Sequence, residues 1–286
     1  MKTIRLAATL SIFLIAFFVI EAQEREADPV TLQKISDHTY QVNGGSGANG
    51  GVIIGENEII VIDSKMDEIS VKQTLKAIGG VSFNPVTYLV NTHSDGDHIM
   101  GNRYFPPSVK VVAHENCRED FFKENFGRPS DWDEPANYPF TPSITFKERM
   151  NIWMGKERVE LHYYGKGHTA GDIIVFVPDE KVAFIGDLFF QDRPQLIHSN
   201  KEGNSFEYVQ TLSEILEDLD AEIFISGHSV PVGRSEMKKQ IQAMEMRQDK
   251  VKELMGEGLN LEEVLSHFDE NESRLVTSIY GEISNE

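Results

Sequence analysis

Six consecutive residues of this chain, 93–98, read His-Ser-Asp-Gly-Asp-His and follow the apolar run Val86–Val90 after two residues. An apolar run of this length is typical of a buried strand. His93, Asp95 and Asp97 recur at every second position, so an extended backbone would project them to one side. Loops that follow strands of a rigid scaffold often carry functional sites. Because two imidazoles and two carboxylates lie within six residues, the segment predicts part of a metal site at a strand end.

Three further ligand-type residues repeat this arrangement, each directly after a glycine at the end of a strand-like stretch. They are His168, Asp187 and His228, and the stretches before them are residues 159–164, 182–185 and 223–226. Glycine lets the backbone turn tightly or approach a neighbour closely. The repetition predicts that the ends of several strands converge on one edge, where these side chains meet residues 93–98.

The remaining pattern predicts an α/β chain with a mixed sheet, because some strands alternate with helices while others follow one another directly. Further strands are expected at 30–42, 52–63 (with a turn at 55–57), 109–113 and 173–177. Helices are expected at 68–78, 114–126, 206–219 and 235–255, the last with a core-facing methionine stripe. Asn260 and Glu263 form a capping box for a last short helix.

Two segments between these elements have a bearing on a site. The glycine-rich residues 44–51 are interpreted as a hairpin tip, since no Lys-Ser/Thr pair follows to make a phosphate cradle. Residues 127–143 contain four prolines, and both a wall over a site and an ordinary packed surface loop fit that composition.

The N-terminus predicts export. Residues 1–22 combine a basic start, a short apolar run and a small residue at Ala22, as in a secretory signal peptide, leaving residues 23–286 as a single domain in the periplasm or outside the cell. A membrane association is expected only if this segment stays uncleaved. The net charge of −19 disfavours nucleic acid and anionic membranes as partners. The lone Cys117 allows no internal disulfide and is interpreted as structural.

The order of these motifs resembles the metallo-β-lactamase-fold hydrolase superfamily. The resemblance runs from the strand ending at Asp63 through His228 and implies a four-layer αββα sandwich with mixed sheets. It also implies two divalent metal ions, with zinc the expected metal. One ion would be held by His93, Asp95 and His168, the other by Asp97, His98 and His228, with Asp187 bridging both.

Asp95 departs from the family pattern, because most members have histidine at this position. Aspartate is a competent zinc ligand, but a harder oxygen ligand moves preference toward iron or manganese. The flavodiiron branch of the fold has a carboxylate here and binds iron, although no flavin domain fits this chain. A third interpretation is that Asp95 does not bind metal and leaves one site weak or empty.

The resemblance implies hydrolysis of an amide, lactam, lactone or other ester bond by a hydroxide held between two metal ions, with Asp97 orienting the nucleophile. β-Lactamase activity is included, although the lysine that many family lactamases carry after the bridging residue is absent, and Arg193 is the nearest cation. His198 and Asn200 are candidate contacts for a small-molecule substrate. The alternatives are a di-iron oxygen or peroxide reductase and a metal-binding protein of the same fold without hydrolase activity.

Overall fold

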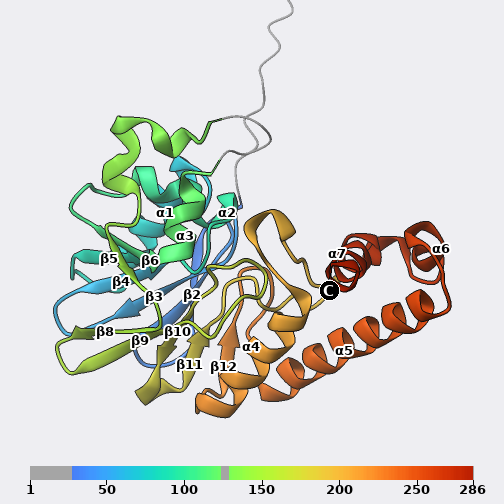
Figure 1. Ribbon diagram of the computed structural model, residues 1–286. Helices are drawn as coiled ribbons and strands as arrows, with labels where there is room; N and C mark the ends of the chain where they lie inside the picture. Colours follow the sequence, from blue (N-terminus) through green and yellow to red (C-terminus); the bar gives the residue numbers. More distant parts are fainter. Residues whose placement is uncertain (1–27, 124–128, 286) are drawn as a thin grey trace, which may run out of the picture.

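The computed structural model describes residues 28–123 and 129–285, whose strands form two sheets (Figure 1). The seven-stranded sheet runs in the order β1 (Thr31–Lys34), β2 (Thr39–Asn43), β3 (Gly50–Ile54), β4 (Ile59–Ile62), β5 (Val86–Val90), β6 (Lys110–His114) and β7 (Ile144–Phe146). The five-stranded sheet runs in the order β12 (Ile223–Ile225), β11 (Val182–Phe184), β10 (Ile174–Val177), β9 (Glu157–His162) and β8 (Arg149–Met154).

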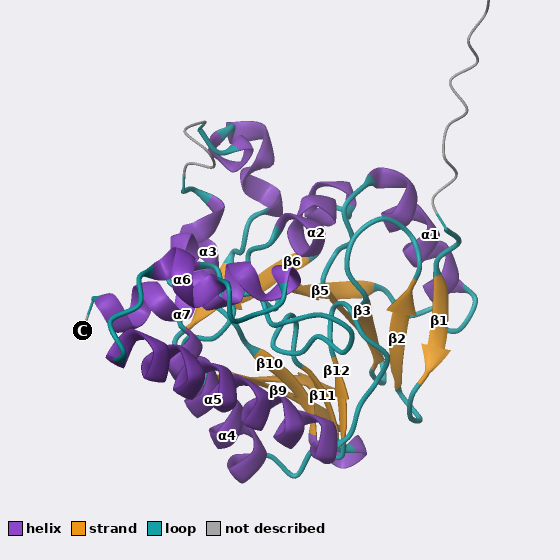
Figure 2. Cartoon of the chain, turned by 90° about the vertical axis from the view of Figure 1, so that its right-hand side faces the viewer, coloured by secondary structure: helices purple, strands orange, loops and turns teal. Residues whose placement is uncertain are grey.

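The helices cover the outer faces of the two sheets. They are α1 (Glu68–Gly79), α2 (Gly96–Ile99), α3 (Glu115–Phe121), α4 (Ser205–Asp218), α5 (Arg234–Gly256), α6 (Leu261–Leu265) and α7 (Ser273–Ser284). Helices α1 and α3 lie on the side of the first sheet, and α4 to α7 lie beyond the second sheet (Figures 1 and 2). No helix within the described residues is long and apolar enough to cross a membrane.

The period-two alternation of the strands builds the layers. On β4, Ile60 and Ile62 join the apolar core between the sheets, whereas Ile59 and Val61 join the core under α1. On β10, Val175 lies between the sheets, and its neighbours Ile174 and Phe176 pack toward α4 and α5. Strands that are buried on both faces are therefore apolar at every position. These layers confirm the predicted αββα sandwich with mixed sheets.

The strand directions bring the ligand-bearing loops to one edge. In the first sheet, β4, β5, β6 and β7 are parallel, and in the second sheet β11 and β12 are parallel. Strand β10 is antiparallel to both β9 and β11, so β9 points the same way as β11. The segments that follow β5, β9, β11 and β12 consequently meet where the two sheets face each other, as the sequence pattern predicts.

Two predicted elements are wrong in their bounds. The strand expected at 30–42 is two strands, because the chain reverses between β1 and β2, where the Ile35 amide donates to the Thr39 carbonyl at 2.9 Å. The helix expected at 114–126 begins after His114, which acts as its N-cap, and ends at Phe121. Residues 124–126 lie outside the described residues, as does the predicted signal peptide at 1–22.

Other elements match the prediction or were missed. Within the predicted methionine stripe of α5, Met237, Met244 and Val251 are buried, and Asn260 caps α6 in a capping box with Glu263. Strands β7 and β8 and helix α7 were not predicted. Helix α6 is thus not the last helix, because α7 follows and packs Leu275, Val276 and Ile279 into the core beside α5.

Candidate metal centre

All seven predicted metal ligands come together at the edge between the two sheets. One group of potential ligand atoms belongs to His93, Asp95, His168 and Asp187, and a second group belongs to Asp97, His98 and His228. The residues 93–98 follow β5 of the first sheet, whereas His168, Asp187 and His228 follow β9, β11 and β12 of the second. The centre is therefore assembled from both sheets.

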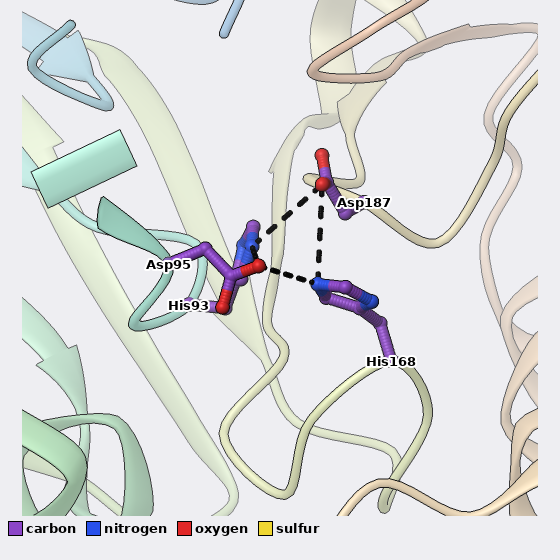
Figure 3. Close-up of side chains that lie close together, drawn as sticks. All are labelled: His93, Asp95, His168 and Asp187. Atoms are coloured by element: carbon purple, nitrogen blue, oxygen red, sulfur yellow. Dashed lines mark hydrogen bonds and ion pairs between the residues drawn. The ribbon is translucent and has the colours of Figure 1, made fainter. Parts of the chain in front are cut away.

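In the first group, side chains from three loops point toward one another (Figure 3). Asp95 Oδ2 lies 3.1 Å from His168 Nε2 and 3.8 Å from His93 Nε2. Asp187 Oδ2 lies 3.9 Å from each of the same two nitrogens. Ligands that are 2.0–2.2 Å from a tetrahedral zinc ion lie about 3.3–3.6 Å apart, so this spacing fits a metal ion at the centre of the group.

Asp187 lies between the two groups. Its Oδ1 is 3.1 Å from His98 Nε2, and its Oδ2 is 3.3 Å from His228 Nε2. His228 Nε2 is also 3.1 Å from Asp97 Oδ2, which closes the second group. Because one carboxylate contacts imidazoles of both groups, its position suits the bridging role that the resemblance implies.

The burial of the donor atoms tests whether these residues fit a metal. The Nε2 atoms of His93 and His98 and the Oδ1 atom of Asp187 are buried, and none of them makes a hydrogen bond within the described residues. Buried polar atoms without a partner are costly. Unpaired nitrogen and oxygen atoms that converge on one region are the arrangement that a divalent cation satisfies, so the residues fit the metal.

Hydrogen bonds behind three of the imidazoles fix which nitrogen faces the centre. His98 Nδ1 lies 2.8 Å from Asp63 Oδ2, His168 Nδ1 lies 2.8 Å from the Leu196 carbonyl, and His93 Nδ1 lies 3.1 Å from Thr92 Oγ1. A partner on Nδ1 leaves Nε2 free to bind metal. Sequence reasoning missed Asp63 as a functional residue, although Asp63 follows the apolar strand β4 just as the candidate metal ligands follow their strands.

The charged side chains of the cluster shift one another's pKa values. Burial alone would raise the pKa of Asp187, but the charge of His98 and the hydrogen bond of His228 hold it well below its usual range. Burial alone would lower the pKa of His168, but the hydrogen bond to Asp95 and the charge of Asp187 raise it to about 9. Without metal, a proton on His168 therefore offsets part of the carboxylate charge, and a bound cation would take its place.

Close approach at Gly227 explains the glycine before His228. A Cβ atom at this position would lie 2.4 Å from Asp187 Oδ1 and 2.6 Å from His98 Cε1. The glycine-rich hairpin loop also reaches this place, because the amide of Asn49 donates to the Gly227 carbonyl at 2.6 Å. The loop thus connects β2 and β3, as predicted, and packs against the metal centre.

The centre opens to solvent on the side of Asp97 and His228, whose side chains are 31% and 29% exposed. A cavity of about 550 Å³ lies next to the 93–98 motif and is lined by Ser94, Trp132 and Asn200 among others. Residues 129–132 line this cavity, so the proline-containing segment forms a wall there. Asn200, a predicted substrate contact, lies at its rim.

His198, the other predicted substrate contact, lies against the first ligand group. Its Nε2 is 3.0 Å from Asp95 Oδ2. The nearby Lys201 also contacts Asp95, with Nζ 2.7 Å from Oδ1. Sequence reasoning missed Lys201, because no motif marks it. Their roles toward a substrate stay predictions.

The remaining predicted features are structural in character. His114 Nδ1 accepts the Asn116 amide at the start of α3, and His162 is buried in β9. Cys117 is a buried free cysteine, and burial raises the pKa of its thiol. Arg193, the first cation after Asp187 in the sequence, stacks over the Phe190 ring with its Cζ 3.9 Å from the ring centroid.

Comparisons with known proteins agree with this geometry. The family model described as "Metallo-beta-lactamase superfamily" matches residues 43–228. A metallo-beta-lactamase type 2 from Elizabethkingia meningoseptica is 25% identical over 213 residues, covering 66% of this chain and 81% of that protein. The 2,4-dinitroanisole O-demethylase subunit alpha from Nocardioides sp. (strain JS1661) is 24% identical over 188 residues, covering 65% of this chain and 54% of that protein.

Solved structures show the same fold at low identity. A metallo-beta-lactamase from Pontibacter korlensis is 18% identical with a TM-score of 0.63, covering 76% of this chain and 99% of that one. A variant of the sec-alkyl sulfatase PisA1 is 18% identical with a TM-score of 0.73, covering 89% of this chain and 50% of that one.

Proposed function

The chain belongs to the metallo-beta-lactamase superfamily, and from that premise we propose that it is an exported metal-dependent hydrolase with a binuclear zinc centre. Members of this superfamily are mostly hydrolases. The bond cleaved is an amide, lactam, lactone or other ester bond. The observation that carries the proposal is that buried nitrogen and oxygen atoms of His93, His98 and Asp187 have no hydrogen-bond partner within the described residues. These potential metal-ligand atoms converge at an edge that is open to solvent.

In the proposed hydrolysis, the metal ions and Asp97 have different roles. When bound, two divalent ions lower the pKa of water toward neutrality and supply hydroxide at neutral pH. Asp97 is the carboxylate best placed to meet a substrate, since it is 31% exposed whereas Asp187 is 4% exposed. Burial raises the pKa of Asp97, but the hydrogen bond of His228 and the charge of His98 lower it below its usual value. Asp97 is thus ionised at neutral pH and accepts a proton, which it can pass to the leaving group.

The substrate is a small molecule that reaches the centre on the side of Asp97 and His228, where the site is open to solvent. β-Lactams are one candidate class, supported by the named lactamase relatives. Sulfate esters are a second class, supported by the extent of the fold shared with a sec-alkyl sulfatase. Arg193 lies over the Phe190 ring, which stacks against His228 with centroids 5.4 Å apart, and it is a candidate contact for an anionic substrate group.

The first experiment measures metal content and activity on one preparation. Elemental analysis of the purified mature protein should find close to two zinc ions per chain. Less than one metal ion per chain, with no increase in activity when zinc, iron or manganese is added, would contradict the proposal that the protein is a metal-dependent hydrolase. Iron together with oxygen or peroxide reduction supports the di-iron alternative that Asp95 suggests. A panel of carboxylic esters, lactones, β-lactams and sulfate esters then identifies the bond.

The second experiment tests the role of Asp97. We expect Asp97→Asn to abolish hydrolysis while the circular dichroism spectrum and unfolding midpoint stay unchanged. Asp179→Asn is the matched control, because Asp179 is exposed at the far end of β10. Full activity in Asp97→Asn would refute this mechanism.

Export is a separate part of the proposal and has its own test. The basic and apolar character of residues 1–22 supports cleavage after Ala22. The mass of the protein recovered from the periplasm or medium should then correspond to a chain that starts at residue 23. Recovery of the full-length chain in the membrane fraction would show an anchor instead.

A further inference from the structure

Lys201 makes a direct ion pair with the one predicted ligand that departs from the family pattern. It ends a short 3-10 helix, Ser199–Lys201, in the loop between Asp187 and α4. Its Nζ lies 2.7 Å from Asp95 Oδ1 and donates to the Ser94 carbonyl at 2.9 Å. The two side chains are only 22% and 14% exposed, so water screens this ion pair little.

The contacts divide the two oxygens of Asp95 between separate tasks. Oδ1 is held by Lys201, whereas Oδ2 faces the imidazoles of His93, His168 and His198. A carboxylate held by one oxygen presents the other in a fixed direction. Lys201 thereby sets Asp95 to bind a metal through Oδ2 alone, as a single imidazole nitrogen would.

The charges of the pair also match those of histidine. A histidine ligand is neutral, whereas aspartate adds one negative charge to a group that already contains Asp187. The ammonium of Lys201 restores the missing positive charge at 2.7 Å. The neighbouring lysines do not have this role, because Lys123 and Lys166 pair with Glu202 instead.

We propose that Lys201 is a positioning residue of the metal centre, and that the Asp95–Lys201 pair takes the place of the histidine found in most relatives. The inference rests on the proposed metal centre but not on the identity of the substrate. It requires that the loop 199–203 holds the motif 93–98 in position through the contact between Lys201 and Asp95, although 100 residues separate the two segments in the sequence.

The test is a double-mutant cycle read out by zinc binding. Zinc stoichiometry is measured by elemental analysis, and zinc affinity by competition with a chromophoric chelator, for the wild type, Lys201→Met, Asp95→His and the double variant. We expect Lys201→Met to lower the affinity of the protein for one of the two zinc ions about 10–100-fold. In the Asp95→His background, Lys201→Met should change the affinity less than about threefold, because a neutral histidine needs no cation beside it.

Two controls keep the outcome decisive. Lys166→Met removes a lysine near the same loop that does not touch Asp95, and it should leave both zinc ions bound as in the wild type. Lys201→Arg keeps the charge and should retain most of the affinity. If Lys201→Met fails to fold, the double variant should fold again, and its failure to do so would overturn the inference.

Other results separate this inference from the proposed function. An equal loss of zinc in both backgrounds, or no loss in Lys201→Met, would overturn the role of Lys201. A wild-type protein that binds two zinc ions but hydrolyses nothing in the panel would refute the hydrolase and leave the Lys201 result intact. A wild-type protein that binds no zinc would overturn both.

Discussion

Asp63→Asn is the change that tests how the protein orients a metal ligand from behind. Asp63 is buried, and its Oδ2 accepts hydrogen bonds from His98 Nδ1 at 2.8 Å and Thr92 Oγ1 at 2.7 Å. Its Oδ1 accepts the Thr92 amide at 2.8 Å. Asparagine can keep the Oδ1 bond, but it places an NH₂ group where Oδ2 was. His98 must then accept at Nδ1, which puts its proton on Nε2, the atom that faces the metal.

The expected effects have two separable magnitudes. Losing a hydrogen bond to a charged group lowers the free energy of unfolding of the metal-free protein by about 1.5–3 kcal/mol. Losing the orientation of His98 lowers zinc affinity about 10–100-fold. Urea unfolding of the chelated protein measures the first quantity, and chelator competition measures the second.

A matched control shows whether the effect of Asp63→Asn comes from its contact with His98 or from the Asp-to-Asn change itself. Asp67→Asn changes the same residue type at the N-cap of α1, where it accepts the Ser70 amide at 2.8 Å. Asparagine caps helices about as well as aspartate, so zinc affinity and stability should stay near those of the wild type. Unchanged zinc affinity in Asp63→Asn would refute the orientation argument, even if the protein were less stable.

Three further changes test other parts of the structure. Gly227→Ala introduces a Cβ 2.4 Å from Asp187 Oδ1; zinc affinity should fall more than about tenfold, and an unchanged chelator competition curve would contradict the close packing. The metal-free protein should lose stability in urea as pH rises from 6.5 through about 9, because the pKa values of His168 and His228 are raised from 6.5 in the unfolded chain to about 9 in the folded one, so folding binds protons in this range. Zinc affinity should rise over the same range, and a flat stability profile would count against the buried ion pairs. Tyr208→Phe removes a buried hydroxyl that donates to the Leu188 carbonyl at 2.8 Å; it should cost about 1–3 kcal/mol in urea unfolding, whereas no change would show that the hydroxyl is dispensable.

The convergence of the candidate metal ligands is predictable from the sequence because each candidate is marked by its neighbours in the chain. Each ligand follows an apolar strand, and the glycines before His168, Asp187 and His228 mark tight turns or close approaches. The layers are predictable for the same reason, since runs such as Ile59–Ile62 are apolar on both faces of a buried strand.

Other features depend on partners that are distant in the sequence. Lys201 looks like any surface lysine until the fold brings it to Asp95, and Asp63 gains its role only when β4 lies beside β5. Strand β8 escapes prediction because its exposed Trp153 and polar residues blur the apolar pattern, and only pairing with β9 defines it. Such features require the three-dimensional arrangement.

Because the centre is assembled from both sheets, metal binding has to follow folding. Residues 93–98 belong to one sheet and His168, Asp187 and His228 to the other, so the binding site exists only after the sheets have packed together. The ion then binds the folded state alone and stabilises it by a free energy that grows with the logarithm of the free ion concentration. If the chain folds after the proposed export, the compartment in which the two sheets pack together is the one that supplies the metal.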